Sequence, residues 1–395
     1  MRSRIISGSG IRFFYGVSRF PSGQGAHSEQ EKIVDRVINF AAGPSMMPEV
    51  VLKAIQEAVY NYEGHGFSIL EMSHRTAMFD AIMLELKTRI KSLLAVPDDY
   101  EMLFCPGGGR MQFAMVPLNL CTQGCRGGYV VTGTWSRMAS EEARKVSREV
   151  TLWSGSNREL PTNLIRVPND VDYVYFCDNE TVDGTEFRGL PAVDDEDAVF
   201  VSDMSSNFMS RPVDVSRYGC IWAGVQKNFG AAGLTSVIVR RDLLGNAAET
   251  VPNMLDWSVY AKSGSLPNTP PVLQIYAAML MARWVESEGG VAEMNRRALA
   301  RSELLYKTID DMGDFYVSSI APEARSRMNI VFTLKDESLT KDFVAEAAAQ
   351  GMINLAGHRS VGGIRASLYN VMPIEAVEKL VAFMKDFAGR HGRIC

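Results

Sequence analysis

The sequence predicts an α/β fold built around a largely parallel sheet. Short runs rich in β-branched and aromatic residues alternate with stretches of helical periodicity, which is the pattern of strands joined by helical crossovers. The chain has 395 residues, of which 46% are hydrophobic and 22% charged, and no internal repeat interrupts residues 38–395. This length allows a large core, and we expect one large and one small domain.

The expected strands of the large domain are short apolar runs. They cover residues 101–105, 128–132, 173–177, 198–202, 220–223 and 235–240. Helices are expected between them, at residues 111–118 and 135–145, and the apolar run 275–280 fits a buried helix.

A different pattern begins near residue 288. We expect a helix at 291–312, strands at 329–334 and 364–369, and helices at 339–349 and 373–390. The organisation therefore predicts four parts, which are an N-terminal extension (1–37), a segment that joins the small domain (38–54), a large domain (55–287) and a small C-terminal domain (288–395).

Composition argues against several classes of protein. The formal net charge of −5 argues against general nucleic-acid binding, although a local basic pocket stays open. No apolar run approaches the about 18–20 residues of a membrane span, so no membrane association is expected. The cysteines have no Cys-x-x-Cys spacing and do not cluster with histidines, which predicts free thiols and no metal site. They are Cys105, Cys121, Cys125, Cys177, Cys220 and Cys395.

The first 28 residues have a composition of their own. Four arginines, several serines and interleaved apolar residues precede the first acid, Glu29. This composition fits an organellar import sequence, for a mitochondrion or a plastid, and it lacks the continuous apolar stretch of a secretory signal. The alternative is a tail without a targeting function on a cytoplasmic protein.

Two residues of opposite charge each follow an apolar run. Asp203 ends the run 198–202, and Lys227 comes shortly after the run 220–223. An acid and an amine at the ends of buried strands are costly unless something uses them. Pyridoxal phosphate needs such a pair, a lysine for its aldehyde and an acid for its ring nitrogen. The alternative is a strand-end acid and a lysine on a surface turn.

Other polar and aromatic residues fall at strand ends as well. The motif Gly107-Gly108-Gly109-Arg110 follows one strand and precedes a helix, where backbone N–H groups and the guanidinium could bind a phosphate. Trp135 and Thr181 follow two further strands, and the tryptophan face could stack on a planar ring. An ordinary turn and a core tryptophan are the alternatives. In parallel sheets, however, ligands bind at the carboxyl edge, where all these residues converge.

Two His-Arg pairs indicate an anion pocket. His358 and Arg359 lie in a glycine-rich turn that leads to Arg365, and His74-Arg75 forms the second pair. Taken alone, a His-Arg pair is most often a solvated surface feature. Together the two pairs and Arg365 exceed what one carboxylate needs, which suggests a substrate with two anionic ends, one of them a phosphate.

With these motifs assembled, residues 39–391 resemble the phosphoserine aminotransferases, a class V, fold-type I family that uses pyridoxal phosphate. The most specific string is Gly357-His358-Arg359-Ser360-Val361-Gly362-Gly363-Ile364-Arg365. Further matches are Asn39–Pro44, Glu71–Arg75, Gly107–Arg110, Asp203–Ser206, Ala223–Asn228 and Ser265–Pro271. Cysteine desulfurases and alanine–glyoxylate aminotransferases share the sheet and the lysine but not the first string. The resemblance implies a mainly parallel seven-stranded sheet flanked by helices, with a small C-terminal α/β domain.

The resemblance also implies roles for individual residues. Lys227 would form the internal aldimine and Asp203 would pair with the pyridinium nitrogen, while Trp135 would stack on the ring and Thr181 would lie near its phenolic oxygen. Gly109, Arg110 and Gln226 would hold the phosphate, with Asn268 and Thr269 reaching in from the second subunit of a homodimer. Arg365 would bind the α-carboxylate. The distal pocket would comprise His74, Arg75, His358 and Arg359. Ala42 stands where the family often has serine, so a substrate contact there would come from the backbone.

The implied reaction is a ping-pong amino transfer from glutamate to 3-phosphohydroxypyruvate that gives phosphoserine and 2-oxoglutarate in serine biosynthesis. Whether 4-phosphohydroxythreonine is also a substrate stays open. Two rival interpretations are another fold-type I enzyme, such as an alanine–glyoxylate transaminase or a desulfurase, and a non-catalytic module on the same scaffold. The paired Asp203 and Lys227 argue against the non-catalytic module.

Overall fold

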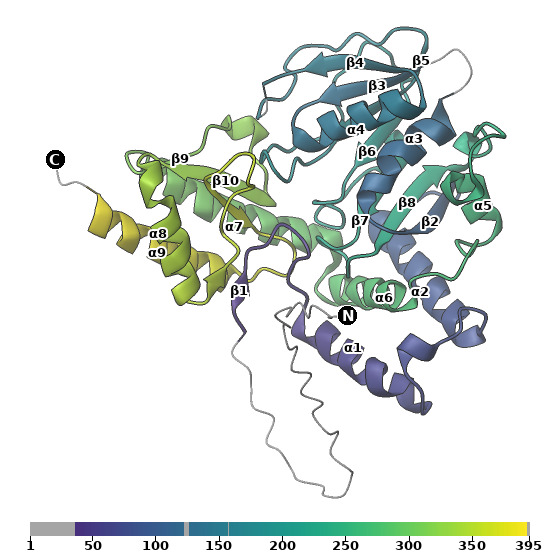
Figure 1. Cartoon of the computed structure of the whole chain (residues 1–395), viewed down its shortest axis with the longest axis horizontal. Coiled ribbons are helices and arrows are strands. Elements are labelled where there is room, and N and C mark those ends of the chain that lie inside the picture. Colours follow the sequence, from purple (N-terminus) through teal and green to yellow (C-terminus); the bar gives the residue numbers. More distant parts are fainter. Residues whose placement is uncertain (1–35, 122–125, 157, 393–395) are drawn as a thin grey trace, which may run out of the picture. The chain divides into compact units, whose positions relative to one another are not determined.

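A seven-stranded sheet forms the centre of the structure, a computed structural model that describes residues 36–121, 126–156 and 158–392. The strand order is β2-β8-β7-β6-β5-β3-β4, and β8 alone is antiparallel to both of its neighbours. The mainly parallel seven-stranded sheet is therefore confirmed (Figure 1). The strands are β2 (Tyr100–Pro106), β3 (Arg126–Val131), β4 (Glu149–Ser154), β5 (Val171–Cys177), β6 (Phe200–Asp203), β7 (Cys220–Gly224) and β8 (Leu234–Arg240).

Helices cover both faces of this sheet because successive strand residues point in opposite directions. In β5, Val174 and Phe176 pack with α1 (Glu49–Asn61), α2 (Ala77–Leu94) and α6 (Val272–Ser287). Tyr173 and Tyr175 pack on the other face, with α3 (Gln112–Leu120), α4 (Thr134–Val146) and α5 (Trp257–Lys262). Two apolar layers enclose the strands, as in other parallel sheets.

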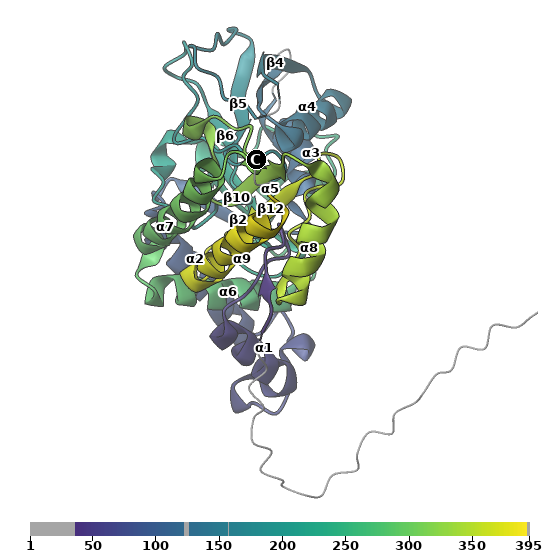
Figure 2. The same cartoon turned by 90° about the vertical axis from the view of Figure 1, so that its left-hand side faces the viewer.

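A second group of elements forms its own apolar core. The strands β9 (Tyr316–Val317), β10 (Asn329–Leu334) and β12 (Ile364–Ser367) make an antiparallel sheet in the order β12-β10-β9. Beside it, β1 (Ile38–Asn39) pairs in parallel with β11 (Met352–Ile353). The helices are α7 (Gly290–Asp311), α8 (Thr340–Ala349) and α9 (Ile374–His391), and α9 lies between the other two (Figure 2).

The ring of Phe343 lies at the centre of this second core. It is fully buried, and its edge-to-face neighbours are Tyr316, Phe332, Phe383 and Phe387. Phe40 packs in the same core, whereas Val51 and Ala58 of α1 pack with the seven-stranded sheet. The division into domains at residues 54/55 and 287/288 stays a prediction.

The expected elements lie close to the observed ones, with one strand of the large sheet missed. Strand β4 is an edge strand whose residues are at most half-buried, so it shows no apolar run in the sequence. Of the cysteines, Cys105, Cys177 and Cys220 are buried, Cys121 is half-buried, and none of these four is in a disulfide. Cys125, Cys395 and the extension to residue 35 lie outside the described residues.

No helix within residues 36–121, 126–156 and 158–392 combines the length and the apolar content that a bilayer crossing requires. In the same ranges, no three or more histidine, cysteine, aspartate or glutamate side chains gather in a way that could hold a metal ion.

Candidate functional site

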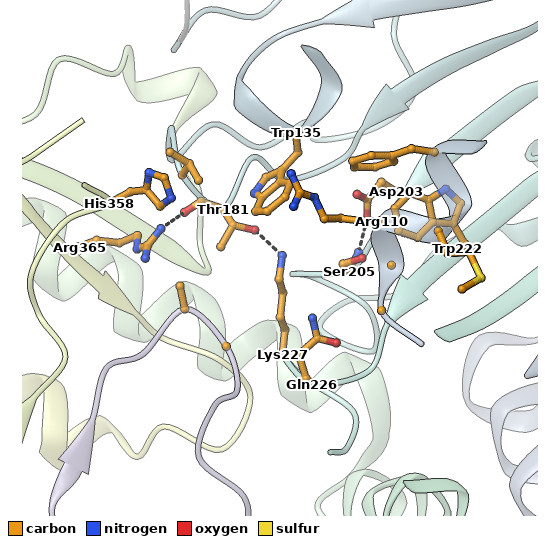
Figure 3. A pocket seen from close by; sticks show the side chains of 17 residues that line it. Arg110, Trp135, Thr181, Asp203, Ser205, Trp222, Gln226, Lys227, His358 and Arg365 are labelled. Carbon is orange, nitrogen blue, oxygen red and sulfur yellow. Dashed lines mark hydrogen bonds between the residues drawn. The ribbon is translucent and has the colours of Figure 1, made fainter. Parts of the chain in front are cut away.

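The loops after five parallel strands line one cavity of about 590 Å³ at the carboxyl edge of the large sheet (Figure 3). These strands are β2, β3, β5, β6 and β7, and β2 runs parallel to β7 because β8 is antiparallel to both. A volume of this size suits a cofactor and a small substrate. Ten predicted site residues line the cavity, namely Ala42, Gly109, Arg110, Trp135, Thr181, Asp203, Gln226, Lys227, His358 and Arg365.

Asp203 is the last residue of β6, and it is buried. In register, it lies beside Cys177 of β5 and Trp222 of β7, so its backbone is held between two strands. The backbone N–H of Ser205 donates to the Asp203 carboxylate over 2.8 Å. Burial raises the pKa of Asp203, and the positive charge of Lys227 opposes that rise. The carboxylate is therefore placed to be stabilised by a positive group in the cavity.

Lys227 follows β7 in a turn, and its amine points into the same cavity (Figure 3). The Nζ atom donates to Thr181 Oγ1 over 2.7 Å and lies 5.4 Å from the centre of the Trp135 ring. Burial lowers the pKa of Lys227, and Asp203 opposes that shift. A lowered pKa favours the neutral amine, which is the nucleophilic form. Asp203 and Lys227, both described, form no ion pair within 4.0 Å, so a gap separates them.

Glycines let the backbone approach the lysine and the wall of the cavity closely. A Cβ on Gly43, whose φ is +127°, would lie 3.2 Å from Cγ of Lys227. A Cβ on Gly109 would lie only 2.8 Å from the Trp222 ring and 3.3 Å from Ser205 Oγ. Larger residues at these two positions would therefore move the lysine stem or the glycine loop.

The Gly-Gly-Gly-Arg motif lies at the start of a helix, as predicted. Gly109 begins a short 3₁₀ helix (Gly109–Met111) that continues directly into α3. The Arg110 guanidinium lies 5.9 Å from the centre of the Trp135 ring and forms no ion pair within the described chain. A helix start and a cation without an ion pair on one rim of the cavity make this the side suited to a phosphate.

The second core contributes the opposite wall of the cavity. Arg365 of β12 donates to the backbone oxygen of Thr181 over 3.2 Å, and burial lowers the pKa of its guanidinium. His358 lines the cavity, with its Nδ1 2.6 Å from Ser360 Oγ. The backbone oxygen of Ala42 accepts a hydrogen bond from the hydroxyl of Tyr369 over 2.8 Å. Within the described residues, Arg365 thus keeps donors that an anionic ligand could use.

Five predicted site residues do not line this cavity. Asn268 and Thr269 are exposed, and so are Arg75 and Arg359, while His74 is half-buried. Arg359 directly follows the cavity residue His358, whereas the His74-Arg75 pair lies in a turn before α2. The single chain therefore brings together seven of the nine predicted cofactor residues and three of the six predicted substrate residues.

Several residues that line the cavity belong to no recognisable chemical motif, and they were not predicted from the sequence. Ser205 accepts a hydrogen bond from the Gly224 backbone over 3.0 Å, which ties the end of β7 to the loop after β6. Its position two residues after Asp203 was the available signal. Met111, Phe113 and Val182 add apolar lining, and nothing in the sequence distinguishes them from core residues.

The residues of the cavity fit pyridoxal phosphate. The Trp135 face can stack on the planar ring, and the Lys227 amine can bind the aldehyde. The carboxylate of Asp203, which burial destabilises, can pair with the ring nitrogen. Trp135 Nε1 and Gln226 Oε1 are buried polar atoms without a hydrogen-bond partner in the described chain. Buried polar atoms of this kind are usually paired, so a polar ligand beside them is expected.

Comparisons with known proteins agree with this chemistry. The family model for class-V aminotransferases matches residues 37–380. Phosphoserine aminotransferase 2, chloroplastic, of Arabidopsis thaliana is 45% identical over 360 residues, which are 90% of this chain and 85% of that protein.

Two solved structures share the fold closely. The phosphoserine aminotransferase of Bacillus circulans subsp. alkalophilus has a TM-score of 0.87 and 39% identity, over 90% of this chain and 99% of that one. The phosphoserine aminotransferase of Trichomonas vaginalis, solved with pyridoxal phosphate bound, has a TM-score of 0.84 and 36% identity, over 89% of this chain and all of that one. The chain therefore belongs to the phosphoserine aminotransferase family of class-V aminotransferases, whose cofactor is pyridoxal phosphate.

Proposed function

We propose that the protein transfers the amino group of glutamate to 3-phosphohydroxypyruvate, which yields O-phospho-L-serine and 2-oxoglutarate. The observation that carries the proposal is the buried Asp203 carboxylate and the Lys227 amine on one cavity, with the Trp135 ring beside the amine. The relatives bear the same activity in their names. The exchange is a two-stage one, in which 2-oxoglutarate leaves before 3-phosphohydroxypyruvate binds.

Each residue of the cavity has its own role in the two stages of the amino transfer. When bound, pyridoxal phosphate supplies an aldehyde for the amino group and a protonated ring that withdraws electrons. Lys227 would hold the aldehyde, and its amine, once an amino acid has displaced it, would take the proton from the substrate Cα. Asp203 would keep the ring nitrogen protonated. Thr181, already bonded to the amine over 2.7 Å, keeps Nζ on the reacting side.

The substrate would lie between two cationic groups. Arg365, with donors free beyond its bond to Thr181, would bind the α-carboxylate shared by all the substrates. His358 and Arg359 would bind the distal end, which is a carboxylate in glutamate and a phosphate in phosphoserine. A pocket that accepts both anions must rely on charge and on several donors rather than on a tight shape.

A homodimer with shared active sites would complete the pocket. Asn268 and Thr269 are exposed and do not line the cavity of their own chain, as expected for residues that serve a partner. The same arrangement would bring the half-buried His74 and the exposed Arg75 to the distal pocket of the partner. Dimers with self-complementary interfaces are the commonest assembly of soluble enzymes.

The proposed location of the protein is an organelle into which it is imported. The Arabidopsis relative is named as chloroplastic. The arginine-rich, acid-free composition before Glu29 is that of an import sequence, for a plastid or a mitochondrion.

Replacing Lys227 tests the proposed chemistry. Purified protein incubated with pyridoxal phosphate should show the visible absorbance band of a lysine-bound cofactor and turn over glutamate with 3-phosphohydroxypyruvate. Lys227→Ala should lose both, whereas Lys145→Ala, which removes an exposed lysine of α4, should keep both. Turnover with alanine in place of glutamate would point to the rival transaminases. A wild-type protein that stays colourless with added cofactor contradicts the proposal.

Removing the distal cations tests the substrate pocket. The double variant His358→Ala with Arg359→Ala should lose about 2–4 kcal/mol of transition-state binding, roughly 30- to 1,000-fold in kcat/KM for 3-phosphohydroxypyruvate. The exposed Arg296 of α7 offers the control Arg296→Ala, which should be silent. An unchanged kcat/KM in the double variant would exclude this pocket.

Mixing two inactive variants tests the shared site. Lys227→Ala and the double variant Asn268→Ala with Thr269→Ala should each be poorly active at limiting cofactor. After subunit exchange, a mixed dimer contains one site with all residues intact, so an equal mixture should recover about a quarter of wild-type activity. Activity no higher than the mean of the two parents would mean that each chain builds its site alone.

A reporter fusion tests whether residues 1–37 direct import into an organelle. Residues 1–37 joined to a fluorescent protein should direct it into plastids or mitochondria. A variant with the arginines at positions 2, 4, 12 and 19 changed to glutamine should remain in the cytosol. Cytosolic fluorescence with the unmodified segment would remove the import proposal and leave the enzymatic one intact.

A further inference from the structure

Two buried acids outside the predicted site hold the start of α4. Glu180 is fully buried and Asp183 is 1% exposed, and both lie in the loop that also carries Thr181. The Glu180 carboxylate accepts hydrogen bonds from the backbone N–H groups of Trp135 and Ser136, each over 2.8 Å, and from Ser136 Oγ over 2.6 Å. Asp183 accepts from the backbone of Thr134 over 2.6 Å. The first turn of α4 is therefore held by a loop 45 residues further along the chain.

This attachment is sterically tight. A Cβ added to Gly133, the residue before α4, would lie 2.6 Å from Asp183 Oδ2 and 2.7 Å from the carboxyl carbon of Glu180. The helix start and the two acids thus leave no room for a side chain between them. The position of the Trp135 backbone is fixed relative to the acidic loop, and the tryptophan ring projects from that backbone into the cavity (Figure 3).

The next residue of the loop points to the reacting groups. Thr181 Oγ1 accepts from the Lys227 amine over 2.7 Å, and its backbone oxygen accepts from Arg365 over 3.2 Å. Two consecutive residues therefore join the ring-stacking tryptophan on one side to the lysine and the substrate-binding arginine on the other. A displacement of Glu180 would change the distance and the angle between Trp135 and Lys227.

We propose that Glu180 is a positioning residue of the amino-transfer site, whose carboxylate sets the orientation of the Trp135 ring relative to Lys227 and Thr181. The inference rests on the proposed function, because it assigns the ring and the amine to one bound cofactor.

The environment of Glu180 is poorly explained by helix capping alone. A side chain from the preceding residue usually caps a helix, and a neutral hydroxyl is sufficient. Glu180 and Asp183 form no ion pair within the described chain, so their burial is costly. Burial and the neighbouring Asp183 raise the pKa of Glu180 to about 7. The cost of burying Glu180 is understandable if its carboxylate fixes the position of Trp135 that the reaction requires.

The test compares Glu180→Gln with Glu149→Gln. Glu149 accepts hydrogen bonds from Ser140 and Arg144 in the later turns of the same helix, so its loss weakens α4 away from Trp135. Three properties of the protein are measured, namely the melting temperature without cofactor, the Kd of pyridoxal phosphate and the visible circular dichroism of the bound cofactor. The last reports how the cofactor sits against Trp135 and not how stable the helix is.

We expect Glu180→Gln to raise the Kd of pyridoxal phosphate roughly ten- to one-hundredfold, as the loss of one charged hydrogen bond would. The circular dichroism of the bound cofactor should change as well, and Glu149→Gln should alter neither property even if it lowers the melting temperature. Wild-type values of Kd and dichroism in Glu180→Gln would overturn the proposal and leave a simple helix cap.

A second variant serves if Glu180→Gln does not fold. Ser136→Ala removes the hydroxyl bond to Glu180, together with the bonds that this hydroxyl accepts from the backbone of Thr132 and Gly133, and keeps the two backbone bonds to Glu180. A several-fold rise in Kd with altered dichroism is expected. An unchanged Kd and dichroism in Ser136→Ala would then overturn the role of Glu180. Failure of the wild-type protein to bind pyridoxal phosphate at all is a different result, which would reject the proposed function itself.

Discussion

The placement of an acid and an amine on one buried cavity is the constraint on which the rest of the structure depends. Asp203 ends β6 and Lys227 lies in the turn after the neighbouring β7, and each opposes the pKa shift that burial imposes on the other. Neither charge is stable there alone. The gap between them and the Trp135 face beside the amine suit a flat ring that carries a protonated nitrogen for the acid and an aldehyde for the amine.

The parallel sheet explains how distant residues reach this cavity. Five strands point their carboxyl ends to one edge, and each delivers a short loop at the same level. The second core closes the cavity with Arg365 of β12, which reaches the backbone of Thr181. The loop after β5 is the meeting point, because its residues contact α4, Lys227 and Arg365.

Much of this could be predicted from the sequence, because strand ends are readable from apolar runs. Asp203, Lys227, Trp135 and Thr181 follow such runs directly, and the rule for parallel sheets places them together. Edge strand β4 could not be found, since its residues are only half-buried. Glu180 could not be assigned either. An acid next to a threonine is typical of a solvated loop, and only its contacts with α4 reveal that it is buried. Asn268 is exposed and does not line the cavity, so a single chain does not show the role that the proposed dimer would give it.

The protonation of the cofactor ring tests the central pair most directly. With pyridoxal phosphate labelled by ¹⁵N in its ring, the nitrogen chemical shift in the wild-type protein should be that of a protonated pyridine at neutral pH and above. In Asp203→Ala, whose buried partner is gone, the shift should move to that of the unprotonated ring while Lys227 still binds the cofactor. A ring nitrogen with the same protonation state in both proteins would contradict the account.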